Sequence, residues 1–361
     1  MPKELIATGP GQTTLREYEE PPLGDAQIRI RSEFAAPKHG TESHGFSGDA
    51  SLSENYFDPE YRIMLPREKK QSLFPRPLGN MTVGTVVEAG SEVTKFKVGD
   101  RVYGHLPIRE THTVDQDGRG GKGPKSLGSG VQERRIHRVP EGMSPQQVVI
   151  LDPAHFALAA VRDANVRLGE RVAVFGLGAI GLLIVQMARM SGAGFVFAVD
   201  PLANRRALAE RYGADRTFDP TDCDVGYEIK KATSGRGADV AIEASAVYAA
   251  LQDAIRSVHY SGLVVTVSFY KGEGTALRLG EEWHLTRVTV RSSMPVWGNP
   301  SRDYPMWDDE RLEDTVLKLM CEERLNIEGL IDPIVPFEKS DEAYLLIGEH
   351  PDQCIKLGIT F

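Results

Sequence analysis

The clearest chemical signal in this sequence is a glycine-rich segment. Gly176, Gly178 and Gly181 follow the apolar run 171–175 (RVAVF) and open a run of helix-forming residues, in the pattern G-x-G-x-x-G. The first glycine permits a tight turn, the second lets the backbone approach a pyrophosphate, and the third allows a helix to pack closely on a strand. The pattern and its context together predict a site for a dinucleotide.

Neighbouring residues indicate which dinucleotide binds there. Ala179 and Ile180 begin the predicted helix, whose N–H groups and partial positive charge would face the phosphates. Asp200 ends the next apolar run, about 20 residues after the last glycine, where a carboxylate receives the adenosine ribose hydroxyls. A carboxylate there would repel a 2′-phosphate, so we expect NAD rather than NADP. Arg205 leaves NADP as an alternative cofactor, because a guanidinium group pairs well with phosphate.

Alternating apolar and helical runs must position these residues. Beyond residue 151, almost continuously apolar runs alternate with helical ones, as in a parallel sheet that helices cover on both faces. The predicted strands are 171–175, 194–199, 239–243 and 263–268, and the predicted helices are 179–191 and 203–212. We therefore expect an α/β fold with a doubly wound parallel sheet over residues 151–292.

Residues 1–150 follow a different pattern. Short alternating or β-branched runs are separated by two long irregular stretches, 38–78 and 106–131. The predicted strands are 26–31, 83–88 and 100–103. Short strands with long connections are typical of a β-rich domain with a partly open barrel.

The last part of the chain, residues 293–361, no longer alternates. Residues 311–323 are predicted to form a helix and residues 353–361 a final strand. We expect this tail to return to the first domain.

The composition excludes several classes of protein. The 361 residues carry a formal net charge of −9, which argues against a general nucleic-acid binder because such proteins need a basic surface. No apolar run reaches the roughly 20 residues of a membrane span. The first residues lack the apolar core of a secretion signal, so we expect a cytoplasmic protein that does not bind membranes. The 3 cysteines contain no C-x-x-C pair and form no disulfide framework.

Four further segments carry a resemblance to a known family. Residues 39–48 (HGTESHGFSG) are similar to a C-G-T-D-x-H segment, and residues 79–90 (GNMTVGTVVEAG) to a G-H-E-x-x-G-x-V-x-x-x-G segment. Residues 98–102 (VGDRV) match a V-G-D-R-V turn, and residues 151–153 (LDP) an E-P step. With the glycine motif, the chain resembles the medium-chain, zinc-type alcohol-dehydrogenase-like oxidoreductases over nearly its full length. The resemblance implies a GroES-like catalytic domain followed by a Rossmann coenzyme domain.

The resemblance also implies further coenzyme contacts. Arg205 stands where the family often has a base that contacts the ribose. Ser268, Phe269 and Tyr270 stand where the backbone usually meets the nicotinamide carboxamide.

The zinc positions of the family are where this sequence departs from it. The three ligand positions hold His39, Asn80 and Asp152, and a neutral amide is a poor ligand for zinc. The lobe that carries a structural zinc in the family has no counterpart, because residues 104–139 contain no cysteine. We expect neither zinc site. The alternative is a catalytic zinc site with three ligands, His39, Asp152 and His155.

Side chains must then manage the charge on the reacting oxygen. His39 is the first candidate for general acid and base, because imidazole titrates near neutral pH. Asp152 would hold its other ring nitrogen, and Asn80 would donate a hydrogen bond to the developing alkoxide. Thr41 and His44 match the family's hydroxyl–imidazole relay, which carries protons to solvent.

The substrate and the partners are inferred from polar inserts and from an edge strand. The inserts 49–74 and 106–131 are rich in polar residues, which suggests a sugar, a polyol or a cyclitol. We therefore expect an NAD-dependent enzyme that interconverts a secondary alcohol and a ketone. The alternatives are a reductase of activated C=C bonds, with a tyrosine or serine near the nicotinamide, and a nucleotide-binding protein without catalysis. Strand 287–293 is expected at the edge of the coenzyme sheet, where it could join a homo-oligomer, a dimer or a tetramer.

Overall fold

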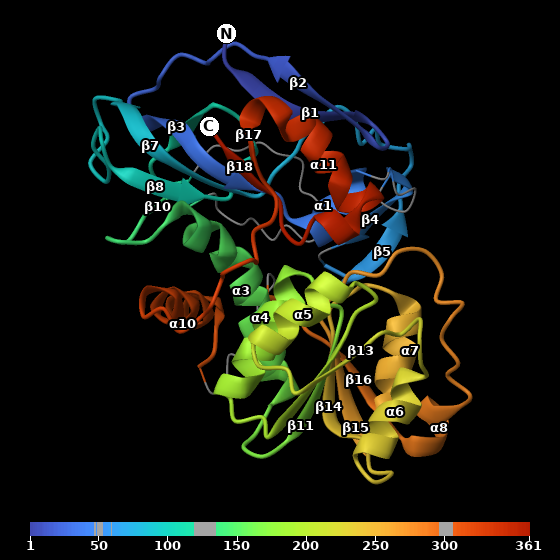
Figure 1. Cartoon of the computed structure of the whole chain (residues 1–361). Helices are drawn as coiled ribbons and strands as arrows, with labels where there is room; N and C mark the ends of the chain where they lie inside the picture. The colour runs from blue at the N-terminus through green and yellow to red at the C-terminus, as the bar shows by residue number, and fades with distance from the viewer. Residues whose placement is uncertain (47, 49–52, 59, 119–134, 296–305) are drawn as a thin grey trace. The chain divides into compact units, whose positions relative to one another are not determined.

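The computed structural model describes the chain except residues 47, 49–52, 59, 119–134 and 296–305 (Figure 1). Its contacts divide the chain into two compact units. One comprises Met1–Ile150 and Leu330–Phe361, and the other comprises Leu151–Gly329. In the described ranges, no helix combines the length and the apolar character that crossing a membrane requires.

The described residues of this tail, 293–295 and 306–329, group with the second unit rather than the first, where we expected them. Helix α10 (Asp309–Cys321) begins two residues before the predicted helix and buries Leu312, Val316 and Met320. Beyond it, the Gln186 side chain exchanges two hydrogen bonds with the backbone of Asn326, at 2.8 and 2.9 Å. These contacts hold the segment to the coenzyme unit, and the chain changes unit only after Gly329.

The second unit is built on a six-stranded sheet in which all neighbouring strands are parallel. Its order is β13 (Arg216–Phe218), β12 (Phe195–Val199), β11 (Arg171–Phe175), β14 (Ala238–Glu243), β15 (Val258–Thr266), β16 (Thr289–Ser292). Helices α4 (Ala179–Met190) and α5 (Ala203–Arg211) lie on one face, and α6 (Val225–Ala232) and α7 (Tyr248–Ser257) on the other (Figure 1). The predicted doubly wound sheet is present.

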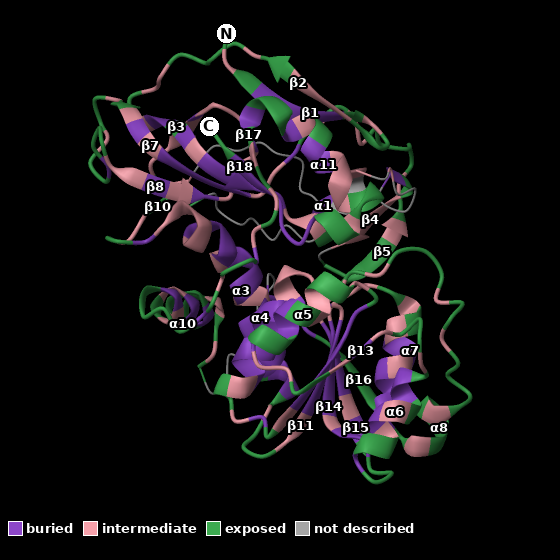
Figure 2. Cartoon of the chain, viewed as in Figure 1, coloured by how far each residue is buried: buried purple, intermediate pink, exposed green. Residues whose placement is uncertain are grey.

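Apolar strands between two helical layers explain why this sheet forms. Val172, Val174 and Phe175 of β11 are at most 1% exposed, and Figure 2 shows the middle strands in the colour of buried residues. β-branched and aromatic residues favour such doubly covered strands. Helix α4 likewise buries Gly181 through Ala188 without a break. Burial on every side gives this element little freedom to shift.

The strand order reverses between β11 and β14. From β11 the chain runs outward through β12 and β13, and then returns to the other side of β11 to form β14, β15 and β16. Sheets of this kind bind ligands at the carboxyl ends of the strands, beside the point where the order reverses. The glycine segment follows β11 and therefore lies at that point.

The first unit is β-rich, as predicted. Its largest sheet has seven strands: β10 (His137–Arg138), β8 (Arg101–Gly104), β7 (Met81–Ala89), β3 (Gln27–Ala36), β18 (Gly358–Thr360), β17 (Ile334–Pro336), with β9 (Thr111–Asp115) paired to β3. A second sheet joins β2 (Gln12–Glu17), β1 (Lys3–Gly9) and β6 (Arg76–Pro77). Strand β18 pairs antiparallel with β3, so the end of the chain does return to this unit. It is shorter than the predicted strand 353–361.

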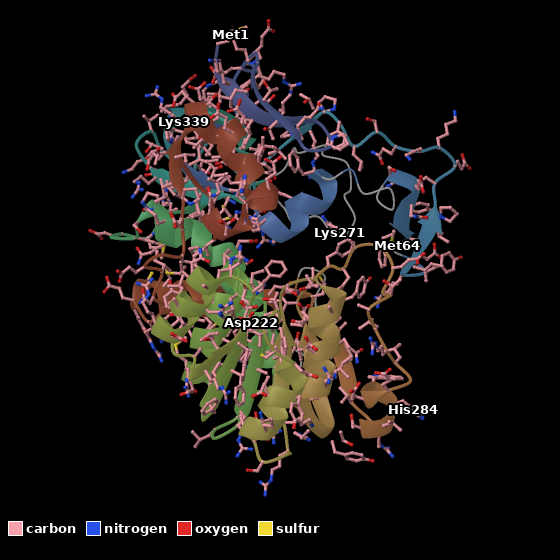
Figure 3. The ribbon with its side chains drawn as sticks, turned by 45° about the vertical axis from the view of Figure 1, so that its right-hand side comes forward. Met1, Met64, Asp222, Lys271, His284 and Lys339 are labelled. Atoms are coloured by element: carbon pink, nitrogen blue, oxygen red, sulfur yellow. The ribbon has the colours of Figure 1, made fainter. Side chains whose placement is uncertain are left out.

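The stretch 38–78, which we predicted to be irregular, contains several elements. Helix α1 (His39–Phe46) and the hairpin of β4 (Asn55–Asp58) and β5 (Ile63–Pro66) lie in it, and Figure 3 marks Met64 on that hairpin. Strand β9 lies in the second irregular stretch, 106–131, whose residues 119–131 fall outside the described residues. Two glycines and few apolar residues give α1 little helical signal of its own, so tertiary contacts must hold it.

Two longer helices complete the part of the fold that positions the site. Helix α3 (Pro145–Ala164) carries the division between the units within it, and helix α11 (Ser340–Glu349) belongs to the first unit. Helix α3 contains Asp152, and helix α11 contains Tyr344.

Candidate functional site

The three glycines of the motif play three different structural roles. Gly176 has φ +84°, which L-residues rarely adopt, and a Cβ there would lie 2.6 Å from Cβ of Ser245. A Cβ on Gly181 would lie 1.8 Å from the carbonyl oxygen of Gly176, so this helix packs too closely for any side chain. A Cβ on Gly178 would meet no described heavy atom within 4 Å. Open space therefore lies in front of the second glycine, where a pyrophosphate would approach.

The start of helix α4 is arranged to receive an anion. Gly178 is its N-cap residue, no side chain caps it, and the first helical bond is Leu182 N to Gly178 O, 2.9 Å. The N–H groups of Ala179 and Ile180 have no acceptor among the described residues. Helix N-termini with unpaired N–H groups attract phosphate through both the N–H groups and the helix dipole.

Asp200 is buried at the end of β12. Its Oδ2 accepts a hydrogen bond from Leu177 N at 2.8 Å, and its Oδ1 accepts one from Leu202 N at 2.9 Å. The carboxylate thus ties the glycine turn to the start of α5. Nη1 of Arg205 lies 3.8 Å from Oδ2. The carboxylate that favours NAD therefore lies beside the guanidinium group that could bind the 2′-phosphate of NADP.

The predicted nicotinamide contacts follow strand β15. Oγ of Ser268 accepts a hydrogen bond from Ala246 N at 2.9 Å, and the Phe269 side chain is about half exposed. The Tyr270 hydroxyl donates to Oε2 of Glu243, and its ring stacks on Tyr248 with 4.9 Å between centroids. Tyr270 therefore points its polar end into the protein and leaves its backbone for any contact with a cofactor.

Glu243 is a residue that the sequence reasoning missed. It ends β14, is fully buried, and accepts hydrogen bonds on Oε1 from the Ser245 amide at 2.6 Å and from the Ser245 hydroxyl. Burial raises the pKa of this carboxyl, and its hydrogen bonds oppose that rise. Burial and the nearby Glu243 also raise the pKa of Tyr270. The sequence signal that could have identified Glu243 was an acidic residue at the end of an apolar strand.

His39 begins helix α1 in the first unit. Its Nε2 accepts a hydrogen bond from the backbone N–H of Leu357 at 3.1 Å, between residues 318 positions apart. The neutral ring therefore carries its proton on Nδ1. Nε2 cannot bind a metal or take a proton while this bond is kept, so the predicted role of His39 as a base requires the bond to break.

Asn80 lies directly before β7, and its side chain lies next to His105. Its backbone N–H donates to Ala36 O at 3.3 Å, and its Oδ1 lies 3.4 Å from Nδ1 of His105. The buried Lys356 donates from Nζ to Pro37 O at 2.9 Å. The backbone of residues 36–39 is thus held by the segment that carries Asn80 and by the last segment of the chain.

Glu42 holds helix α1 in place, and the sequence reasoning missed it as well. Its Oε1 accepts a hydrogen bond from Lys38 N, and its Oε2 accepts from Gly79 N at 2.7 Å and from the Tyr344 hydroxyl at 2.9 Å. Burial raises the pKa of Glu42, and these hydrogen bonds oppose the rise. One carboxyl thus joins the segment that carries His39 to the segment that precedes Asn80.

The other predicted catalytic residues are placed less completely. Thr41 and His44 belong to α1, and their side chains lie outside the described residues, so the proton relay stays a prediction. Asp152 is buried on helix α3 in the second unit. Its predicted contact with His39 joins the two units and also stays a prediction.

The residues at the metal positions are a poor fit to a zinc ion. Zinc takes thiolate, imidazole and carboxylate ligands, whereas Asn80 offers a neutral amide whose oxygen faces His105. The Nε2 lone pair of His39 is already used by Leu357. Among the residues that the structure describes, no three His, Cys, Asp or Glu side chains gather as a metal ligand set would.

Comparison with known proteins decides the family. Residues 53–150 match the family model "Alcohol dehydrogenase GroES-like domain", and residues 179–308 match "Zinc-binding dehydrogenase". D-guloside 3-dehydrogenase of Escherichia coli (strain K12) is 40% identical to this chain, over 99% of this chain and 100% of the relative. The chain belongs to the medium-chain, zinc-type alcohol dehydrogenase family. It is therefore an oxidoreductase, as predicted.

Other members of this alcohol dehydrogenase family agree with the fold. (R,R)-butanediol dehydrogenase of Bacillus subtilis (strain 168) is 31% identical, over 71% of this chain and 74% of the relative. The crystal structure of 2R,3R-butanediol dehydrogenase from Bacillus subtilis has a TM-score of 0.73 at 24% identity and covers 100% of both chains. A Sinorhizobium meliloti 1021 dehydrogenase bound to NADP has a TM-score of 0.72 at 22% identity, over 100% of this chain and 99% of its own. The GroES-like domain and the Rossmann sheet are thus confirmed.

Proposed function

We propose that this enzyme interconverts a secondary alcohol and a ketone on a sugar-like or polyol-like substrate, with NAD and without catalytic zinc. The observation that carries the cofactor assignment is the pairing of the open space at Gly178 with the buried carboxylate of Asp200. The substrate class is supported by the E. coli relative, whose name places its reaction on a D-guloside. The polar inserts of the first unit favour the same class.

NAD is proposed over NADP on electrostatic grounds. Both carboxylate oxygens of Asp200 accept backbone hydrogen bonds, which hold the side chain in place. A 2′-phosphate would bring negative charge to this carboxylate. Arg205 lies 3.8 Å from it and already interacts with that charge, so it is a weak attraction for a second anion.

The proposed chemistry at the reacting oxygen uses neutral hydrogen-bond donors. As hydride leaves carbon for the nicotinamide ring, the hydroxyl proton must leave and negative charge develops on oxygen. We propose that Nδ1–H of His39 donates to that oxygen in place of the predicted contact with Asp152, and that the Asn80 amide N–H donates to it as well. The proton then passes to the Thr41 hydroxyl and onward to His44. In this proposal His39 is a donor, whereas the sequence predicted it as the base.

We also propose a homo-oligomer joined through the coenzyme sheet. Strand β16 is the last strand of that sheet, pairs only with β15 among the described residues, and has four exposed residues. Val290 in its middle is 40% exposed. An exposed apolar edge strand can pair with a second copy across a two-fold axis.

Three measurements on the purified protein test the proposed function. Titration with NADH and with NADPH should give at least tenfold tighter binding of NADH. Oxidation with NAD should be faster on glycosides and polyols than on simple secondary alcohols, and a metal chelator should leave the rate unchanged. Preference for NADPH, equal or faster turnover of simple alcohols, or inactivation by the chelator would each refute the corresponding part.

A further inference from the structure

A buried hydrogen-bond network lies at the carboxyl ends of β14 and β15. Glu243 accepts from the amide and the hydroxyl of Ser245 on one oxygen and from the Tyr270 hydroxyl on the other. The Ser245 hydroxyl also accepts from Val247 N at 3.1 Å, so both of its hydrogen-bonding directions are in use. In all three of these bonds the Glu243 carboxyl is the acceptor.

The network joins two loops that leave neighbouring strands. The loop after β14 contains Ala246, whose φ of +64° is unfavourable for a residue with a Cβ and has to be held by its surroundings. Ala246 N donates to the Ser268 hydroxyl in the loop after β15, at 2.9 Å. Glu243 and Tyr270 make a second connection between the same loops. The two loops are therefore fixed to one another by side chains.

The network also reaches the phosphate-binding turn. A Cβ on Gly176 would lie 2.6–2.8 Å from three atoms of Ser245, so the two backbones are in direct contact. On its other side, the Tyr270 ring stacks on Tyr248, whose hydroxyl donates to Gly272 O at 3.1 Å. In Figure 3, Lys271 marks this end of the sheet, and His284 on α8 (Glu282–Thr286) marks the opposite end.

The position of the network indicates which half of a dinucleotide it serves. Asp200, at the end of β12, stands on the side of the glycine turn that would take the adenosine ribose. A dinucleotide that crosses the point of reversed strand order places its other half over β14 and β15. That half is the nicotinamide, and the backbone of residues 268–270 would meet it there.

We propose that Glu243, Ser245 and Tyr270 are positioning residues for the nicotinamide half of the cofactor. Their polar atoms bind one another and hold the 244–248 and 268–270 backbones at a fixed separation, so the nicotinamide subsite exists before the cofactor arrives. This inference rests on the proposed dinucleotide function. It predicts that weakening the network lowers the affinity for the nicotinamide half and leaves the adenosine half unaffected.

The test is the Tyr270→Phe variant, which keeps the ring on Tyr248 and removes only the hydroxyl. Its dissociation constant for NADH should rise about tenfold, while that for ADP, which occupies the adenosine half alone, should change less than twofold. The KM for the cofactor should rise more than kcat falls. Thermal unfolding of the two proteins, measured alongside, shows whether the variant is folded.

Two further variants keep the inference falsifiable. Tyr248→Phe loses the bond to Gly272 O and keeps the Glu243 network, so it should bind NADH normally. Ser245→Ala removes a donor from the same carboxyl and should resemble Tyr270→Phe. Unchanged NADH affinity in both network variants, or an equal loss of NADH and ADP affinity, overturns the inference. If the unsubstituted protein binds neither NADH nor NADPH, the proposed function falls with it.

Discussion

Replacing Gly178 by alanine should separate cofactor binding from fold stability. Gly178 has φ −70° and ψ −174°, which alanine adopts without strain, and the new Cβ would meet no described heavy atom within 4 Å. The free energy of unfolding should therefore change by less than about 1 kcal/mol. The methyl group would instead occupy the space that the pyrophosphate needs. The NADH dissociation constant should rise at least tenfold, which corresponds to about 1.4 kcal/mol.

Gly181→Ala is the matched control, with the same chemical change three residues further on. Its Cβ would lie 1.8 Å from the carbonyl oxygen of Gly176, so the helix or the turn must move. Overpacking of this kind costs about 3 kcal/mol. At roughly 2–4 °C per kcal/mol for a unit of this size, the midpoint of thermal unfolding should fall by about 6–12 °C.

The two variants are compared by thermal unfolding and by fluorescence titration with NADH. The reasoning predicts that Gly178→Ala is stable and binds weakly, whereas Gly181→Ala is destabilised. NADH binding by Gly178→Ala at the original affinity would refute the place of the pyrophosphate. Equal destabilisation of both variants would refute the different roles of the two glycines.

Four substitutions at three other sites test the catalytic unit and the assembly. In His39→Asn, the amide N–H group lies as many bonds from Cα as Nδ1 of histidine, so a donor is kept. In His39→Gln, the amide oxygen lies as many bonds from Cα as Nε2, so an acceptor for Leu357 N is kept. The kcat of the Asn variant should stay within about tenfold of the original, and the kcat of the Gln variant should fall about 10²–10³-fold. Equal kcat values in the two variants would contradict the donor role. Because burial raises the pKa of Glu42, the folded state binds that proton more tightly than the unfolded state. The contribution of Glu42 to the free energy of unfolding should therefore fall as the pH rises from about 4.5 through the raised pKa. Urea unfolding measured at several pH values should show this fall in the unsubstituted protein and not in Glu42→Gln. An identical pH dependence in both proteins would contradict the burial argument. Val290→Lys should shift the protein to a smaller species in light scattering, and a monomeric unsubstituted protein would contradict an oligomer through β16.

The coenzyme unit could be predicted from the sequence because its signals are local. The predicted strand 171–175 is β11, and the predicted helix 179–191 differs from α4 by one residue. Apolar strands, helical runs and the glycines of the turn each act within a few residues of themselves. The tail was harder, because the contact of Gln186 with Asn326 that keeps it in the second unit joins residues 140 positions apart.

The catalytic unit shows the limit of the same reasoning. Helix α1 carries His39, yet two glycines and few apolar residues give it no periodic signal. It is held by Glu42, which accepts hydrogen bonds from Gly79 and from Tyr344 of helix α11. Neither partner is close to Glu42 in sequence, so no local pattern announces the helix or the carboxyl that supports it.

Residue types and short spacings determined where a dinucleotide should approach, and the glycine turn and Asp200 follow from them. Which hydrogen-bond donor meets which acceptor was decided by tertiary structure alone. Leu357 N–H meets Nε2 of His39, the predicted base, and the Tyr270 hydroxyl meets Glu243. Such pairs form when packing brings distant segments within about 3 Å, a distance that composition and periodicity do not encode.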